Sequence, residues 1–341
     1  MTDITLTTNL DPIWNKQNTG ASGSNLKPCY GGGVWLIPVD QGSGDTSKIW
    51  RSMDGVNWAQ VNLPFAVDTV KCLWLQNSSI PNGTFVLIEG NNSVSSIFLT
   101  SPNGLFWTAH NFPVPSYWYC SDIVSTDQGN VLFIVERNAQ SQWRSADLVN
   151  FFHTADSYSQ NQQIGVRRGM LGPFGQYYGF SNTSAAVGIS FDLMAWTSHV
   201  STIEFAIEPL YSPVAKIFVA PGASAFWSED GINWTKSLDD QGAFVDGTYN
   251  MEYDATAGQF VCMSNPKNKI YTSADGKNFK PSTKPWTGPL PNYLAAAQTR
   301  PQQFVSTATV GGNQANYGNP SMISGKLYVP HNFTRLIGVS K

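Results

Sequence analysis

Acidic side chains that could do chemistry recur along the chain at regular intervals. Six segments share a core of Ser or Thr, any residue, Asp or Asn, usually Gly, two more residues and an aromatic. The acidic or amide positions, separated by 49, 44, 45, 38 and 45 residues, are Asp54, Asn103, Asp147, Asp192, Asp230 and Asp275. Paired carboxylates would suit glycoside hydrolysis. Because these positions instead recur once per repeat, each is predicted to close a turn by accepting backbone N–H groups.

The residues around each acidic position predict a β-hairpin. An Asp-Gly pair after a β-rich run is a hairpin signal, since Gly tolerates positive φ. The aromatic that follows is expected to tuck under the turn and to bury about 150–250 Å². Five of these aromatics are Trp58, Trp107, Trp196, Trp234 and Phe279.

The other acids and the histidines give no metal or cofactor pattern. Asp239, Asp240 and Asp246 lie in SLDDQGAFVDG and are expected to be solvated in a loop between two repeats. The four histidines are separated by tens of residues, which is not the spacing of a metal site. We therefore expect no catalytic residues, no metal and no cofactor.

The four cysteines form no CxxC pair and have apolar or aromatic neighbours, so buried free thiols are expected. They are Cys29, Cys72, Cys120 and Cys262.

Two adjacent arginines are the one candidate for ligand binding. Arg167 and Arg168 lie in GVRRGML, which by its place in the repeat is an innermost strand. An arginine lining a central channel could hold an anionic ligand. The alternative is that it pairs with a neighbouring Asp.

The elements that position these residues follow from the repeat. Upstream of the hairpins lie further short β-rich segments, such as GTFVLIEG and NVLFIVER, so each period of about 45 residues contains about four strands. That is the strand count of a propeller blade. The sequence predicts an all-β protein, a single β-propeller of seven blades, with six as the alternative, each a four-stranded antiparallel sheet.

The ends of the chain are expected to close the ring. NYLAAAQ and QFVSTATV resemble the first two strands of a last blade, and residues 4–17 are predicted to supply its outer strands. Residues 1–310 would then form the propeller. Residues 311–341 would add a strand or a tail that docks on a partner.

Composition narrows the function. Charged residues make up 13% of the chain, against about 25% in typical soluble proteins, and the net charge is −3. A nucleic-acid partner is not expected, because it would require a basic surface. The N-terminal MTDITLTTNLDPIW lacks the pattern of a secretory signal, and no apolar run is long enough to insert into a membrane.

The repeat resembles the Asp-box, or sialidase-like (BNR), family of propellers in its short S-x-D-G-x-x-W variant. The similarity covers roughly residues 5–285, and such repeats occur in bacterial and bacteriophage proteins, including tail and virion propellers. The resemblance implies the fold more strongly than any function, because this hairpin occurs in hydrolases, lectins and structural proteins alike.

The sialidase chemistry of that family is not expected here. Sialidases bind the substrate carboxylate with three arginines and carry an Arg-Ile-Pro signature near the N-terminus. This chain has seven arginines, of which Arg51 and Arg144 lie beside the hairpin turns, and WLIPV at Trp35 has Leu in place of Arg.

We therefore expect a non-enzymatic bacteriophage virion component, of the tail, a fibre or the baseplate, for host-surface attachment or particle assembly. It would be made in the host cytoplasm, would be located in the virion and would bind other virion proteins, with a host surface glycan as a further partner. The alternative is a carbohydrate-binding lectin or a glycoside hydrolase. A convergent Asp/Glu pair in the central cavity would favour the hydrolase, whereas an exposed apolar patch would favour assembly.

Overall fold

The computed structural model describes a defined part of the chain. The described residues are 12–17, 24–25, 28–40, 46–55, 57–67, 69–89, 97–112, 118–126, 129–136, 142–154, 166–173, 175–181, 185–192, 196–205, 207, 209–248, 250–255, 257–264, 269–281, 293–296, 303–309 and 320–327. Within these ranges all regular structure is β-strand. No helix there is long and apolar enough to cross a membrane.

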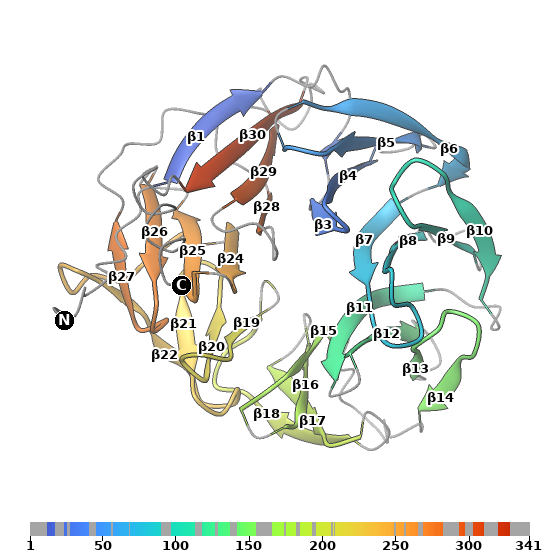
Figure 1. The fold of residues 1–341 in the computed structure, drawn as a ribbon. Coiled ribbons are helices and arrows are strands. Elements are labelled where there is room, and N and C mark those ends of the chain that lie inside the picture. The colour runs from blue at the N-terminus through green and yellow to red at the C-terminus, as the bar shows by residue number, and fades with distance from the viewer. Residues whose placement is uncertain are drawn as a thin grey trace, which may run out of the picture.

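The described strands form seven sheets, which Figure 1 shows side by side around a central axis. We number six of them along the chain. Sheet 1 contains β2 (Ser24–Asn25), β3 (Cys29–Gly31), β4 (Val34–Asp40), β5 (Thr46–Ser52) and β6 (Ala59–Val67). Sheet 2 contains β7 (Thr69–Leu75), β8 (Thr84–Glu89), β9 (Ile97–Ser101) and β10 (Thr108–Asn111). Sheet 3 contains β11 (Trp118–Thr126), β12 (Gly129–Glu136), β13 (Gln142–Ser145) and β14 (Phe152–Thr154).

The second half of the ring repeats this order. Sheet 4 contains β15 (Val166–Leu171), β16 (Tyr177–Ser181), β17 (Ala186–Ser190) and β18 (Thr197–Val200). Sheet 5 contains β19 (Leu210–Ser212), β20 (Ile217–Ala220), β21 (Phe226–Ser228) and β22 (Thr235–Lys236). Sheet 6 contains β23 (Leu238–Asp239), β24 (Asn250–Asp254), β25 (Gln259–Ser264), β26 (Lys269–Ser273) and β27 (Asn278–Pro281). The closing sheet contains β28 (Tyr293–Ala296), β29 (Gln303–Thr309), β30 (Pro320–Leu327) and β1 (Pro12–Gln17).

The chain is thus a single all-β propeller built mainly from antiparallel sheets. Two sheets depart from the expected four antiparallel strands. In sheet 1, β2 and β3 pair with different parts of β4. In sheet 6, β23 adds a fifth strand that runs parallel to β27, because the Leu238 N–H donates to the Lys277 carbonyl as the chain leaves sheet 5.

The closing sheet joins the two ends of the chain. β1 pairs antiparallel with β30, from Pro12 opposite Leu327 to Gln17 opposite Met322. Residues 12–17 therefore supply one outer strand of this sheet. The prediction of outer strands from residues 4–17 also extends over residues 4–11, which lie outside the described residues. The third strand, β30, lies within residues 311–341, for which either a strand or a tail was expected.

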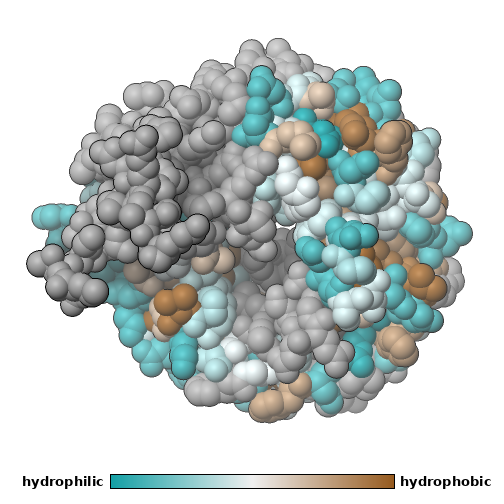
Figure 2. All heavy atoms as spheres, viewed as in Figure 1, coloured by the Kyte–Doolittle hydropathy of each residue, from teal (hydrophilic) through white to brown (hydrophobic). Residues whose placement is uncertain are grey.

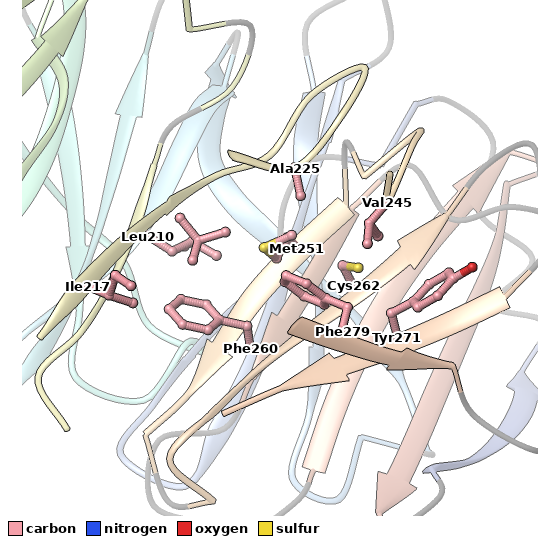
Figure 3. Close-up of a cluster of buried hydrophobic side chains, with 10 residues drawn as sticks. Leu210, Ile217, Ala225, Val245, Met251, Phe260, Cys262, Tyr271 and Phe279 are labelled. Atoms are coloured by element: carbon pink, nitrogen blue, oxygen red, sulfur yellow. The ribbon is translucent and has the colours of Figure 1, made fainter. Parts of the chain in front are cut away.

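The core lies between neighbouring sheets. Figure 3 shows one such cluster, in which Leu210 and Ile217 of sheet 5 face Phe260 and Phe279 of sheet 6. Equivalent clusters join sheets 1 and 2, around Leu36, and sheets 4 and 5. Each sheet buries apolar side chains against its neighbours, so the ring is held together by sheet-to-sheet packing.

Three innermost strands contain a β-bulge. In β7 the register shifts between Thr69 and Lys71, and in β11 between Tyr119 and Ser121. In β15 it shifts between Val166 and Gly169. A bulge adds one residue to one strand and increases its local twist.

Candidate functional site

The repeated Ser-x-Asp segments form six turns between the third and fourth strands of sheets 1–6. We call these turns 1–6, starting at Ser52, Ser101, Ser145, Ser190, Ser228 and Ser273. In turn 5 the Ser228 hydroxyl donates to Asp230 Oδ1 (2.9 Å) and accepts from the Gly231 N–H (2.9 Å). Asp230 Oδ1 also accepts the backbone N–H groups of Ile232 and Asn233, both at 2.8 Å. The carboxylate therefore closes the turn.

The same hydrogen bonds recur with local variation. In turn 2 Asn103 replaces Asp, and its Oδ1 accepts the N–H groups of Leu105 (2.9 Å) and Phe106 (3.3 Å). In turn 4 the Ser190 hydroxyl donates to Asp192 Oδ1 at 3.1 Å. The six serines are at most 4% exposed, so they are the buried polar anchors of the turns.

An asparagine three residues after the acid completes four of the turns, and the sequence analysis did not single it out. Its side-chain amide donates to the second carboxylate oxygen of the turn, at 2.7–2.9 Å. These residues are Asn57, Asn150, Asn233 and Asn278. In turns 2 and 4 the position holds Phe106 and Ala195. The repeated Asp-x-x-Asn spacing was the signal that could have revealed it.

These hydrogen bonds keep the turn carboxylates ionised. Partial burial opposes ionisation of Asp147, but donors from Asn150, Val149 and Ser145 outweigh it and lower the pKa to about 2. The pKa values of Asp230 and Asp275 are lowered by the same balance. A general acid needs a raised pKa, so the turn carboxylates are unsuited to that role.

In turns 1, 2, 3, 5 and 6 the residue after the Asp or Asn adopts a left-handed backbone. In four of these turns it is glycine, whose lack of a side chain allows close packing. Gly276 has φ +67°, and a Cβ built there would lie 2.5 Å from Val219 Cγ2 of the preceding sheet. In turn 3 this position is Leu148, with φ 62°. Its side chain is buried against Leu75 and Phe98 of sheet 2, which offsets a left-handed cost of about 1–2 kcal/mol.

The repeat aromatics differ in how deeply they are buried. Phe279, Trp234 and Trp196 are 0%, 8% and 9% exposed. The Trp234 Nε1–H donates to the Gly231 carbonyl at 3.1 Å, which fixes the ring beneath its own turn. Trp58 and Trp107 are only half-buried, so these two extend further toward solvent than the sequence suggests.

Hydrogen bonds link each of turns 2–6 to the sheet before it. The links to turns 2–6 are Arg51 Nε to the Asn103 carbonyl (2.8 Å), Asn77 Nδ2 to the Ala146 carbonyl (2.8 Å), Arg144 Nη1 to the Asp192 carbonyl (3.3 Å), the Thr202 N–H to the Ile232 carbonyl (3.0 Å) and Ser237 Oγ to the Gly276 carbonyl (2.7 Å). Arg51 and Arg144 therefore have a structural role, because each donates a hydrogen bond from its own sheet to the turn of the next sheet. We call the linked turns the turn belt.

Turns 1–4 expose a set of large apolar side chains that we call the apolar arc. Its members are 43–79% exposed and are Met53, Leu105, Phe106, Val149, Phe152 and Phe191. Because each comes from the connection between the third and fourth strands, or from the first residue after it, they follow one another along the ring. Turns 5 and 6 instead expose Glu229 and Lys277, which form an ion pair at 2.8 Å. Figure 2 shows hydrophobic groups lying between hydrophilic ones on the described surface of one side.

The arginine pair lies in the bulge of β15. Val166 pairs with Ser181 and Gly169 with Gly179, so Arg167 and Arg168 together face one residue of β16. β15 is the edge strand of sheet 4 that lies toward the centre of the ring (Figure 1), as the sequence predicts. The two side chains lie outside the described part, so the channel-ligand role stays a prediction.

The remaining candidates are held in local structure. Asp239 accepts the N–H groups of Gln241 and Ala243, and Asp246 accepts the Ser224 hydroxyl at 2.6 Å. Cys29, Cys72 and Cys262 are buried free thiols, and burial raises the pKa of Cys72 and Cys262. The side chain of Cys120 is not described. Across the described ranges, no three His, Cys, Asp or Glu side chains gather to hold a metal.

Comparison with known proteins gives the fold. No family model and no curated protein sequence matches the chain. Among solved structures, a streptogramin B lyase is similar over 93% of this chain and 98% of its own (8% identity, TM-score 0.62). A catalytically inactive virginiamycin B lyase from Staphylococcus aureus with quinupristin covers 93% and 100% (10% identity, TM-score 0.60). The Dos1 propeller covers 93% and 96% (8% identity, TM-score 0.58). At these identities the likeness extends to the β-propeller fold alone.

Proposed function

We propose that this chain is a non-enzymatic component of a bacteriophage particle, of the tail, a fibre or the baseplate, that attaches the particle or joins its subunits. The observation that supports the proposal is the apolar arc. Its six exposed apolar side chains lie in four consecutive turns, and exposed apolar side chains that gather on one surface are typical of protein–protein contacts. The partner is another virion protein, and the site of action is the virion, after synthesis in the host cytoplasm.

The turn belt supports docking because it fixes the backbone under the arc. Every turn beneath the arc has internal hydrogen bonds, and turns 2, 3 and 4 are also linked to the preceding sheet. A surface whose backbone is ordered before binding loses less conformational entropy when a partner arrives. The arc is therefore suited to assembly, whereas the turn acids already serve as hydrogen-bond acceptors.

Two finer points of the fold belong to the same proposal. Each of the seven sheets counts as one blade, which gives a seven-bladed ring. The Ser-x-Asp turns belong to the Asp-box type, because Ser and Asp, or Asn in turn 2, occupy equivalent places in sheets 1–6.

Glycan binding is the second candidate. Phe106, Phe152 and Phe191 are 75%, 58% and 74% exposed, and aromatic faces stack on sugar rings. A glycan array with bacterial lipopolysaccharides and capsular polysaccharides tests this candidate, with each hit checked for released sugar. Binding that is lost in Phe106→Ser and Phe191→Ser, without sugar release, would assign attachment to the arc. Sugar release would overturn the non-enzymatic proposal.

The test of assembly is incorporation into particles. Wild-type and variant chains are expressed during growth of the source particle, and purified particles are probed for each chain. The double variant Val149→Ser/Phe191→Ser should be incorporated at least tenfold less than wild type. The matched control is Val214→Ser, because Val214 is 73% exposed in sheet 5 outside the arc. Equal incorporation of all three chains would refute the proposal.

A further inference from the structure

Two of the buried cysteines lie in neighbouring sheets of the ring. Cys29 is the first residue of β3 in sheet 1, and Cys72 lies in β7 of sheet 2. These two strands are side by side toward the centre of the ring (Figure 1). The cysteines are 9% and 6% exposed, and they belong to the same apolar cluster as Leu36 and Leu87. The interface between sheets 1 and 2 therefore contains two thiols.

An adjacent contact places the two cysteines face to face. Residues two apart in a strand share a face, so Gly31 is on the same face of β3 as Cys29, and Trp74 is on the same face of β7 as Cys72. A Cβ built at Gly31 would overlap the Trp74 ring, so these two faces are in direct contact. Two residues earlier in both strands, the Cys72 thiol donates a hydrogen bond to the Cys29 sulfur. The two sulfur atoms thus meet across the interface.

In the closed interface the two thiols are protected from reaction. Burial raises the pKa of Cys72, and the contact with Cys29 raises it further. A protonated thiol is a poor nucleophile, because the thiolate is the reactive form. The pair therefore becomes reactive when sheets 1 and 2 separate locally and water reaches the sulfur atoms.

We propose that Cys29 and Cys72 are a disulfide site, at which a low-molecular-weight disulfide oxidises the two thiols to a bond that joins sheet 1 to sheet 2. The inference is independent of the proposed function, because it rests on this interface alone. A chain in a reducing cytosol would carry the two thiols, and the same chain in an oxidising environment would carry the disulfide.

The reaction is an exchange of thiols and disulfides in two steps. In the open interface one cysteine loses its proton, and its thiolate attacks the small disulfide. The S–S bond of the small molecule breaks, and the released thiolate takes up the proton. The second cysteine then loses its proton and attacks the protein sulfur of the mixed disulfide, which releases the second small thiol. Two protein thiols are oxidised, and one small disulfide is reduced to two thiols.

The new bond would stabilise the ring. The segment between Cys29 and Cys72 contains β4, β5, turn 1 and β6, so the bond closes a loop that includes most of sheet 1. Closing a long loop restricts the unfolded chain, which favours the folded state. The bond would also prevent the local opening through which it formed.

Peptide mapping of the full chain tests the site. The reduced protein is incubated with glutathione disulfide in native buffer, remaining thiols are blocked with N-ethylmaleimide, and the chain is digested without reductant for mass spectrometry. We expect a Cys29–Cys72 link as the main product. The link should form about fivefold faster in urea below the unfolding transition, because urea promotes local opening. The oxidised chain should melt at least about 5 °C above the reduced chain.

A matched pair of variants separates the disulfide from the effect of deleting a buried thiol. Cys72→Ala and Cys262→Ala each remove a sulfur from a buried position. Each variant is compared with itself, oxidised against reduced, so that any loss from the truncation cancels. Cys72→Ala should lose both the link and the rise in melting temperature on oxidation, whereas Cys262→Ala should retain both.

Other outcomes would overturn the inference. A link from Cys72 to Cys120, or to a second copy of the chain, would assign a different partner to the thiol. The absence of a linked peptide in the wild type would refute the site. A Cys29–Cys72 link with an unchanged melting temperature would refute its role in joining the two sheets.

Discussion

Turns 1–4 and turns 5–6 share a backbone design but present different surfaces. A buried serine bonded to the following Asp or Asn recurs in all six turns. At the solvent-facing positions, turns 1–4 expose Met53, Phe106, Val149 and Phe191, whereas turns 5 and 6 expose a paired Glu229 and Lys277. The difference shows that Ser and Asp maintain the ring, while the positions between them can vary to form a binding surface.

The two regions also differ in how deeply the tryptophan of each repeat is buried. Truncating these tryptophans should have the largest effect on the free energy of unfolding. Trp234 of turn 5 is 8% exposed and its ring lies among those of Phe180, Phe205 and Phe218. Trp234→Ala should lower the free energy of unfolding by about 3–5 kcal/mol. Trp58→Ala in turn 1 should cost about 1–2 kcal/mol, because that ring is half-buried. Urea unfolding of both variants measures the difference, and equal costs would contradict the packing contrast.

The close approach of turn 6 to sheet 5 gives the next largest effect. Gly276→Ala places a Cβ against Val219 and Ile217 at positive φ, so it should cost about 2–4 kcal/mol. Gly175→Ala is the matched control, because Gly175 has φ +79° with nothing within 4 Å of a built Cβ. The control should cost about 1–2 kcal/mol, from the backbone conformation alone. Thermal unfolding measures both variants. If Gly175→Ala had the lower melting temperature, turn 6 would not be packed closely against sheet 5.

Acid should weaken the turns that contain Asp but not turn 2. The folded pKa of Asp147 is about 2, below an unfolded value of about 3.9, so its contribution is fully present above about pH 4 and is lost as pH falls toward 2. Asp147→Asn should therefore flatten the fall in stability across this window. Urea midpoints measured between about pH 5 and 2 test it. If the urea midpoint fell with pH equally steeply in the wild type and in Asp147→Asn, the Asp147 carboxylate would not be hydrogen-bonded as described.

The exposed ion pair of turns 5 and 6 should have the smallest effect. Lys277 Nζ also lies 4.2 Å from the Trp227 ring centroid. Glu229→Gln should cost about 0.2–1 kcal/mol, and the loss should shrink in about 1 M salt. A larger, salt-independent cost would imply that the charged turns are as important for stability as the buried ones.

Sequence alone predicts the parts of the molecule that are set by local backbone chemistry. Ser, Asp and Gly at fixed spacing determine the turn whatever surrounds it. The turns and the propeller fold could therefore be inferred from the six repeats of this pattern, the first at Asp54 and the last at Asp275. The pairing of β1 with β30 depends on which end of the chain meets which, so the sequence pattern alone could not assign β30 to the closing sheet.

The apolar arc could not be inferred, because its members resemble core residues. In LFW and NFF two adjacent aromatics compete for one buried site. Trp107 and Phe151 take that site, while Phe106 and Phe152 are 75% and 58% exposed. The parallel strand β23 was also missed, since its pairing depends on where sheet 6 lies beside Leu238.

The turn belt has a mechanical consequence for the ring. Its described links run along the circumference from sheet 1 to sheet 6, so they resist outward displacement of any one of these sheets. Tension applied to one turn through Arg51 or Arg144 passes to the next turn and is shared among several short hydrogen bonds. A load that arrives at the rim would thus be distributed along sheets 1–6 before any one of them separates from its neighbour.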